Sequence, residues 1–200
     1  MLKNKENITG YILAGGRSSR MGEDKGLILL NRKPIISYVI NQLRPAVDKI
    51  IIVSNNTVYA QFGYEVIEDT IKNIGPSAGI LAALNHTDTE KNFIVSCDMP
   101  FITTSSIEYI INKSNDYQIA VPIYKDKYEP MFAVYSKECV NKWEELIMLG
   151  TFKMMYIINH FSVLKLNVDN NQEFNDSIFI NINTKEDLQK AIDKLVDNSG

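Results

Sequence analysis

Short apolar runs alternate with segments of helical periodicity along most of this 200-residue chain. Apolar runs indicate buried strands, and apolar positions spaced three and four residues apart indicate amphipathic helices. Their alternation is typical of βαβ units, in which a helix connects two parallel strands. We therefore predict an α/β fold in three layers, with a mostly parallel, twisted sheet between helices. Strands are predicted at residues 9–13, 49–54, 65–67, 93–97, 119–122, 132–135, 163–166 and 178–180.

Helices are predicted between most of these strands. Pro34 precedes a helix predicted at 35–43, and proline is favoured in the first turn of a helix. Further helices are predicted from Thr104, over 138–149, and from Thr184, where Asp187 completes a capping-box-like pattern. Residues 125–128 are polar between two short strands, which predicts a hairpin or a small inserted lobe with antiparallel pairing.

Length and composition favour one globular domain spanning residues 1–200, because 45% of the residues are hydrophobic and 22% are charged. The first ten residues lack the apolar segment of a secretion signal, and no stretch approaches the roughly 18 apolar residues of a membrane span. We expect a soluble, cytoplasmic protein. Cys97 and Cys139 have no C-x-x-C partner, and His86 and His160 are isolated, so we expect reduced thiols and neither a zinc site nor a histidine-based triad.

The charge distribution favours a small anionic ligand. The net charge of -3 gives no general affinity for nucleic acid. Between Gly10 and Pro34, however, five cations stand against two anions. A local basic region on an acidic chain is suited to a small phosphorylated ligand, and a solvated basic loop is the alternative interpretation.

The first loop, residues 14–26, carries the most specific pattern in the chain. It contains the string G-G-x-S-x-R-M-G-x-x-K, from Gly15 to Lys25. Adjacent glycines after a strand let backbone N–H groups approach an anion, and the arginine and lysine side chains can neutralise phosphate oxygens. The spacing matches neither the P-loop nor the dinucleotide-binding fingerprint. The loop therefore predicts a phosphate site of another kind.

Further segments narrow the interpretation. The chain resembles the nucleotidyltransferase fold of sugar-nucleotide pyrophosphorylases and, most closely, the molybdenum cofactor guanylyltransferases, from Gly10 to about Leu188. The resemblance is carried by the first loop and by Asp24-Lys25-Gly26-Leu27, Leu30-Asn31-Arg32-Lys33-Pro34, Val66-Ile67-Glu68-Asp69, Gly75-Pro76-Ser77-Ala78-Gly79, Cys97-Asp98-Met99-Pro100-Phe101-Ile102 and Asn181-Ile182-Asn183-Thr184. It implies a Rossmann-like topology and transfer of GMP from GTP to the terminal phosphate of molybdenum-loaded molybdopterin, with release of pyrophosphate.

The resemblance also implies roles for residues of the first loop. Main-chain groups of this loop would hold the nucleotide, and two cations would brace the triphosphate as charge develops on the leaving group. The residues so implied are Leu13, Ala14, Gly15 and Gly16 for the nucleotide, and Arg20 and Lys25 for catalysis. The reaction needs alignment and charge neutralisation but no protein nucleophile, which is consistent with the absence of a triad.

Asp98 directly follows the apolar run at residues 93–97. A carboxylate at the carboxyl end of a strand is a common ligand of Mg²⁺, which takes its other ligands from water and phosphates. In isolation, a helix cap or a loop residue is the favoured interpretation of Asp98. Together with the first loop, it is predicted to hold Mg²⁺, to contact the nucleotide and to take part in catalysis.

A third loop, residues 68–79, is predicted to bind the guanine base. Guanine presents adjacent donors, so its site needs acceptors from a carboxylate or from backbone carbonyls of a close turn. Candidates for nucleotide contact in this loop are Asp69, Gly75, Pro76 and Gly79, and Asn55, after the strand predicted at 49–54, is a further candidate. Without the resemblance, Gly75-Pro76 is an ordinary turn and Asp69 a solvated residue.

The second substrate is expected across the cleft. Asn181 and Asn183, with residues 125–129, are candidates for the pterin side because amide groups match the hydrogen-bonding edge of a pterin. The alternative is that both asparagines cap the last helix. The resemblance also implies molybdoenzyme maturation proteins as partners, and we expect no nucleic acid and no membrane.

Three departures from the family pattern affect the base contacts: Ser77 replaces a common leucine, Arg32 a common glycine, and Val53 lies where asparagine can occur. A cytidylyltransferase acting on the same cofactor or a sugar-phosphate nucleotidyltransferase is therefore an alternative. A carrier that binds GTP or molybdopterin without catalysis is a second. Retention of Arg20, Lys25 and Asp98 favours an enzyme.

Overall fold

The computed structural model describes residues 7–15, 24–69, 71 and 74–197. Its main sheet has the strand order β10-β7-β9-β6-β1-β4-β5, with β8 paired to β7, and β2 and β3 form a separate two-stranded sheet. The strands are β1 (Ile8–Leu13), β2 (Leu29–Leu30), β3 (Lys33–Pro34), β4 (Lys49–Val53), β5 (Glu65–Ile67), β6 (Lys91–Ser96), β7 (Ile119–Tyr124), β8 (Lys127–Tyr128), β9 (Phe132–Ser136) and β10 (Val163–Asn167).

Helices connect most of these strands. The α-helices are α1 (Ile35–Leu43), α2 (Pro76–His86), α3 (Thr104–Lys113), α4 (Val140–Met148), α5 (Met154–Ile158) and α6 (Lys185–Asp197), and the 3₁₀ helices are η1 (Lys25–Leu27), η2 (Thr57–Phe62) and η3 (Lys137–Cys139). No helix among the described residues has the length and hydrophobicity of a membrane span.

The sheet is mostly parallel, as predicted. Strands β6, β1, β4 and β5 run parallel, as do β7 and β10, whereas β9 runs antiparallel to both β6 and β7. The predicted hairpin is β7–β8, and Lys125 and Asp126 at its turn have φ of 47° and 61°. This left-handed conformation is the one that two-residue hairpin turns require.

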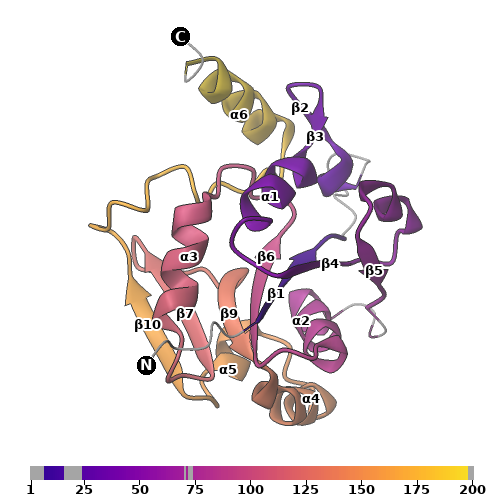
Figure 1. Cartoon of the computed structure of the whole chain (residues 1–200), viewed down its shortest axis with the longest axis vertical. Coiled ribbons are helices and arrows are strands. Elements are labelled where there is room, and N and C mark those ends of the chain that lie inside the picture. The colour runs from indigo at the N-terminus through magenta and orange to yellow at the C-terminus, as the bar shows by residue number, and fades with distance from the viewer. Residues whose placement is uncertain (1–6, 16–23, 70, 72–73, 198–200) are drawn as a thin grey trace.

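Helices cover both faces of the sheet, which makes the three predicted layers (Figure 1). One face packs against α1 and α3, whose apolar sides contribute residues such as Val39 and Ile107 to the core. The other face packs against α2, α4 and α5, with Ile80 and Trp143 among its buried residues. A third apolar cluster joins α6 to the β2–β3 hairpin above the sheet.

The topology locates a binding region at the carboxyl ends of β1 and β6. The chain passes from β1 to β4 and β5 on one side, and then returns to β6 on the other side of β1. Helix α1 covers one face and α2 the opposite face. Such a change of direction separates the loops after neighbouring strands and leaves space for a ligand.

One predicted strand is wrong. Residues 178–180 form no strand: residues 176–179 are a turn, with Ile178 N–H donating to the Asn175 carbonyl (3.2 Å) and Ile180 N–H to the Ser177 carbonyl (3.0 Å). The run is apolar because Ile178 is fully buried and Phe179 packs on the aromatic rings of Phe132 and Phe174. An irregular segment can bury apolar residues as a strand does, so the pattern alone does not distinguish them.

The helix predictions were close. Helix α1 has the predicted bounds, whereas residues 138–149 divide into η3 and α4. Helix α3 starts at Thr104, and its N-cap is Thr103, which forms a capping box with Ser106. At the start of α6, Asp187 accepts hydrogen bonds from the Thr184 N–H (2.9 Å) and donates its own N–H to Thr184 Oγ1 (3.1 Å), so the predicted box is present.

Candidate functional site

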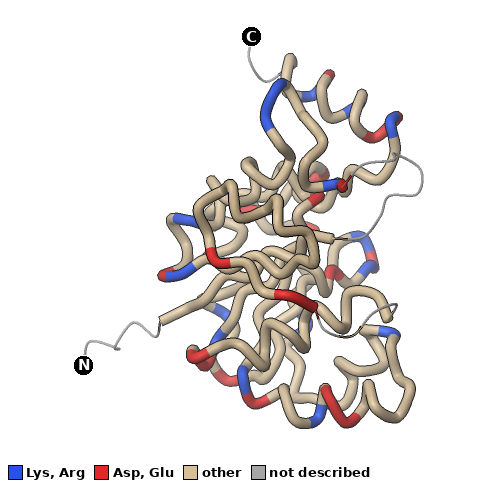
Figure 2. The backbone as a smooth tube through the Cα atoms, turned by 90° about the vertical axis from the view of Figure 1, so that its right-hand side faces the viewer, with Lys and Arg blue, Asp and Glu red and all other residues tan. Residues whose placement is uncertain are grey.

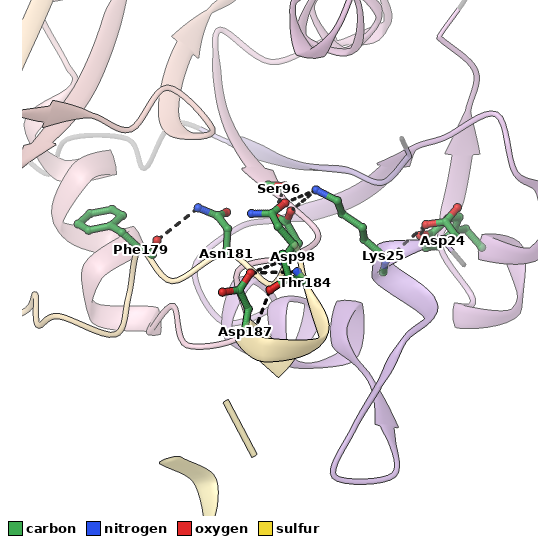
Figure 3. Close-up of polar contacts among 11 residues, drawn as sticks. Asp24, Lys25, Ser96, Asp98, Phe179, Asn181, Thr184 and Asp187 are labelled. Atoms are coloured by element: carbon green, nitrogen blue, oxygen red, sulfur yellow. Dashed lines mark hydrogen bonds and ion pairs between the residues drawn. The ribbon is translucent and has the colours of Figure 1, made fainter. Parts of the chain in front are cut away.

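Three predicted site residues, Lys25, Asp98 and Asn183, meet at the carboxyl edge of the sheet. Lys25 Nζ lies 3.2 Å from Asp98 Oδ2 (Figure 3). It also donates to Asn183 Oδ1. The partners are 73 and 158 residues away from Lys25 in the sequence. The fold therefore joins the start of η1, the end of β6 and the approach to α6 around one ammonium group.

Asp98 is held rigidly at this position. Asp98 is only 6% exposed to solvent. Its Oδ1 accepts a hydrogen bond of 2.5 Å from Ser96 Oγ. Its carbonyl oxygen accepts from the Ile182 N–H at 3.0 Å, which ties the segment before α6 to the end of β6. Because α3 is capped by Thr103, Asp98 is not the cap of that helix. Both carboxylate oxygens are thus satisfied by a hydroxyl and a cation.

The donor set at Asp98 fits Mg²⁺. The carboxylate is a hard oxygen ligand of the kind that Mg²⁺ prefers. The ammonium of Lys25 already lies against its Oδ2, so a positive charge is favourable beside this oxygen. Over the part of the chain that the structure describes, no group of three or more Asp, Glu, His or Cys side chains could hold a metal. A single protein carboxylate suits a metal that takes its other ligands from phosphates and water, and it does not suit a structural zinc site.

The two candidate asparagines differ in their surroundings. The Asn183 side chain accepts from Lys25, and its N–H donates to Asp187 Oδ2 at 3.1 Å. The Asn181 amide donates to the Phe179 carbonyl at 3.3 Å and is directed away from Lys25 (Figure 3). The alternative that both asparagine side chains cap α6 does not hold, because Thr184 and Asp187 form that cap. The structure brings Asn183 into direct contact with the site and Asn181 only near it.

The β7–β8 hairpin is tied to the same C-terminal segment. Lys125 forms an ion pair with Asp176 (2.9 Å), and its N–H donates to Asp169 Oδ1 (2.6 Å). Glu129 follows the hairpin, and burial raises the pKa of its carboxyl group to about 7, with Lys127 opposing the shift. The Lys125 ammonium is thus engaged at the surface, while Glu129 is half-buried.

The predicted nucleotide residues of the first loop are only partly described. Gly16 and Arg20 lie outside the described residues. The Leu13 carbonyl accepts from the Cys97 N–H at 3.1 Å, and the Ala14 N–H donates to the Val53 carbonyl at 2.9 Å. These two main-chain groups therefore already bond to neighbouring segments of the sheet.

Gly15 lies two residues after the end of β1. Its N–H lies against the sulfur of Cys97, a fully buried thiol whose pKa is raised by burial first and by the nearby Asp98 second. A raised pKa disfavours the reactive thiolate, so the surroundings of Cys97 do not favour a nucleophile.

A hydrogen bond joins Asp69 of the third loop to Asn55 of the segment after β4. Asn55 Oδ1 accepts from the Asp69 N–H (3.1 Å), and Asp69 Oδ1 accepts from the Ile71 N–H (2.9 Å). Burial raises the pKa of the Asp69 carboxyl, and the hydrogen bond from Ile71 opposes this shift. Both residues follow the carboxyl ends of neighbouring strands, β4 and β5, and their contact with the base stays a prediction.

The prediction of a turn from Gly75 to Gly79 is wrong for residues 76–79, which belong to helix α2. Gly75 is the N-cap of α2 with φ of 74°, and Pro76 is the first helical residue. Gly79 lies within the helix, where an added Cβ would be 3.1 Å from Leu13 Cδ1. The G-P-x-A-G segment therefore permits close packing of α2 on the end of β1, with proline at its favoured position in the first turn.

Several site residues were missed from the sequence. Ser96 has a weak signal, since it lies two residues before Asp98 at the end of the same strand. Asp24, Asn56 and Tyr59 form a hydrogen-bonded cluster behind Lys25, and nothing in the sequence connects residues from two separate loops.

The charged groups at the site are few, and the described residues around them form no region of a single sign on the face shown in Figure 2. Figure 2 shows that the described Lys and Arg residues are interspersed with Asp and Glu over the face that it presents. The described charges that lie against one another at the site are those of Lys25 and Asp98, with Asp24 adjacent in the sequence.

Comparisons with known proteins show the family of the chain. Residues 10–164 match the MobA-like NTP transferase domain. The chain is 34% identical to a probable molybdenum cofactor guanylyltransferase of Flavobacterium johnsoniae, over 92% of this chain and 95% of the relative. It is 36% identical to the molybdenum cofactor guanylyltransferase of Vibrio parahaemolyticus, over 88% and 91% of the two chains.

A solved structure shares the fold over nearly the whole chain. The molybdopterin-guanine dinucleotide biosynthesis protein A of Archaeoglobus fulgidus superposes with a TM-score of 0.82 at 25% identity, and covers 94% of this chain and 99% of its own. The matched domain spans most of the sequence and includes Lys25 and Asp98. The chain therefore belongs to the MobA-like NTP transferase family.

Proposed function

We propose that this protein is a molybdenum cofactor guanylyltransferase, which transfers GMP from GTP to the terminal phosphate of molybdenum-loaded molybdopterin. The observation that carries the proposal is the convergence of Lys25, Asp98 and Asn183 at the carboxyl edge of the sheet. The relatives named for this activity, at 34% and 36% identity over most of the chain, support the same reaction.

The reaction requires in-line displacement at phosphorus. An oxygen of the acceptor phosphate forms a bond to the α-phosphorus of GTP, and the bond from that phosphorus to the bridging oxygen of pyrophosphate breaks. The Lys25 ammonium neutralises charge on the departing pyrophosphate, for which it must exchange its contacts with Asp98 and Asn183 for phosphate oxygens. Arg20, by resemblance, contributes a second positive charge.

Asp98 is proposed to hold Mg²⁺, aided by Ser96. When bound, the metal would neutralise phosphate charge and orient the triphosphate. The Ser96 hydroxyl fixes one oxygen of the carboxylate and leaves the other directed toward Lys25. Hydrogen bonds of this kind orient a ligand and tune its affinity for the metal.

The remaining residues divide between the two substrates. Asn55 and Asp69, joined by a hydrogen bond, are proposed to contact the nucleotide on the β4–β5 side, where α2 begins at Pro76. Asn183, with Asn181 beside it, is proposed to contact the molybdopterin side. Because Asn183 and Asp98 share Lys25, the two substrates would meet at this lysine.

The test is a transfer assay with four nucleotides. Purified protein is incubated with molybdenum-loaded molybdopterin, Mg²⁺ and each of GTP, CTP, ATP and UTP, and both pyrophosphate and the dinucleotide product are measured. We expect product with GTP. Product with CTP alone would overturn the base assignment, and GTP binding without product from any triphosphate would identify a carrier.

A matched pair of variants tests the role of Asp98. Asp98→Asn keeps the shape of the side chain but removes the charge, and we expect it to lower Mg²⁺-dependent turnover by about 100-fold or more. Asp116→Asn makes the same change at an exposed loop position and should leave turnover unchanged. Turnover of Asp98→Asn equal to that of Asp116→Asn would remove Asp98 from the metal site.

A further inference from the structure

The carboxylate of Asp24 lies next to Lys25 in the sequence, yet it does not pair with the Lys25 ammonium. Its Oδ1 accepts hydrogen bonds from the Tyr59 hydroxyl and from the Gly26 N–H (3.4 Å), and its Oδ2 accepts from Asn56 Nδ2 (3.3 Å). Asp24 is also the N-cap of η1, the short helix that begins at Lys25. Three donors thus hold this carboxylate. Two of them, Asn56 and Tyr59, belong to the segment at the start of η2.

The donor at Tyr59 is immobile. The Tyr59 side chain is fully buried, and burial raises the pKa of its hydroxyl, so the group remains a hydrogen-bond donor. It lies directly beneath Gly26, where an added Cβ would come within 2.5 Å of the hydroxyl oxygen. Because the ring is packed in the core, the position of its hydroxyl limits where Asp24 and Gly26 can lie.

Asn56 is fixed as well. Its N–H donates to Ser54 Oγ (3.1 Å), and its Oδ1 accepts from the Val58 N–H (3.1 Å). With the amide oxygen engaged at the start of η2, the amide nitrogen is directed toward Asp24. The two donors come from one short segment, which makes a rigid anchor for the end of the first loop.

The anchoring of Asp24 determines the direction in which the Lys25 side chain extends. Because the preceding residue is anchored on one side, the Lys25 side chain extends to the other, where its ammonium meets Asp98 and Asn183 (Figure 3). A carboxylate released from Tyr59 would be free to pair with its neighbouring ammonium or to repel the triphosphate. Either change would remove positive charge from the place where phosphate binds.

We propose that Tyr59 and Asp24 are positioning residues for phosphate transfer: their hydrogen bond directs the Lys25 ammonium into the site and keeps the Asp24 charge out of it. This inference rests on the proposed function, in which Lys25 neutralises phosphate charge. Neither residue touches the substrate, so both act through Lys25.

A double-mutant cycle separates this role from a purely structural one. The proteins are the wild type, Tyr59→Phe, Lys25→Met and the double variant. We expect Tyr59→Phe to lower kcat about 10-fold, the lower end for loss of a hydrogen bond to a charged group. In the Lys25→Met background the same change should have no further effect, because the group it positions is gone. Asp24→Ala, which removes the acceptor instead of the donor, should give the same pattern.

A matched control and a second readout complete the test. Tyr38→Phe removes a hydroxyl that donates to the Leu30 carbonyl at 2.8 Å, away from Asp24, and should leave kcat unchanged. The dissociation constant of a GTP analogue with a methylene bridge between the α- and β-phosphorus is measured for all variants. We expect Tyr59→Phe to weaken this binding only when Lys25 is present.

The outcomes are distinct. An equal loss of kcat or affinity from Tyr59→Phe in both backgrounds would overturn the positioning role and indicate general destabilisation. An unchanged kcat and affinity in the Lys25 background would overturn it as well. If the wild type transfers no nucleotide to molybdopterin, the proposed function fails, while the binding cycle still decides whether Tyr59 positions Lys25.

Discussion

Gly26 permits the close approach of the first loop to Tyr59, and Gly26→Ala tests this packing. An added Cβ would lie 2.5 Å from the Tyr59 hydroxyl oxygen, 3.1 Å from Tyr59 Cε1 and 3.2 Å from Cys97 Sγ. The hydroxyl contact is far shorter than van der Waals separation. Since Tyr59 is fully buried, the ring cannot rotate into solvent, and either the loop or the core must shift.

The magnitude follows from two contributions. Overpacking of a dense core costs about 1–3 kcal/mol. Displacing the loop also weakens the hydrogen bond from Tyr59 to the Asp24 carboxylate, and a bond of this type contributes about 1.5–3 kcal/mol. We therefore expect Gly26→Ala to lower the free energy of unfolding by about 2.5–6 kcal/mol, which for a chain of this size lowers Tm by about 5–24 °C.

The assay is denaturant unfolding followed by circular dichroism, for Gly26→Ala in the wild-type and the Tyr59→Phe backgrounds. Tyr59→Phe removes the oxygen at 2.5 Å and leaves only the contacts at 3.1 and 3.2 Å. In that background the loss from Gly26→Ala should fall to about 1 kcal/mol. The same loss in both backgrounds would refute the reasoning, because the hydroxyl would then not be the atom that excludes a side chain at Gly26.

Three further outcomes are expected. Ser96→Ala removes the hydroxyl that orients Asp98, and should raise the Mg²⁺ concentration for half-maximal transfer about 10-fold. An unchanged Mg²⁺ titration would count against this role of Ser96. Glu129 has a pKa raised from 4.5 to about 7 by burial, so its contribution to stability is complete below pH 4.5 and is lost as the pH rises through 7. Glu129→Gln should therefore raise Tm at pH 8 and change it little at pH 4.5, and equal shifts at both values would show that the carboxyl is not desolvated. Asp176→Asn breaks an ion pair with Lys125 in which both side chains are more than half exposed, so thermal unfolding should remain within error of the wild type, and a clear loss would contradict the weakness of exposed pairs.

Local patterns were sufficient for most of the fold. The apolar runs that became β1, β4, β6 and β9 are buried on both faces, and such continuous runs are what a parallel or central strand requires. The helix at residues 35–43 and the capping pair Thr184 and Asp187 were predicted because propensity and capping depend on neighbours in sequence. Residues 178–180 failed because burial of apolar side chains does not require strand geometry.

The candidate site was predicted in part for the same reason. Lys25 and Asp98 stand in short motifs at the ends of strands, where ligands bind in this type of fold. The Gly75 to Gly79 segment was assigned to a turn because glycine and proline indicate turns, yet proline also begins helices and Gly79 serves the packing of α2 on Leu13. Whether such a segment forms a turn or begins a packed helix depends on the elements that surround it in the fold.

The α/β class, the order of most elements and the glycine-rich pattern of the first loop could all be predicted from the sequence, because they follow from periodicity and local spacing. Which distant side chains meet depends on the three-dimensional fold. It placed the Lys25 ammonium between Asp98 and Asn183, 73 and 158 residues away, and the Asp24 carboxylate on the buried hydroxyl of Tyr59. Such contacts depend on strand order and helix packing, which bring together residues that share no local pattern.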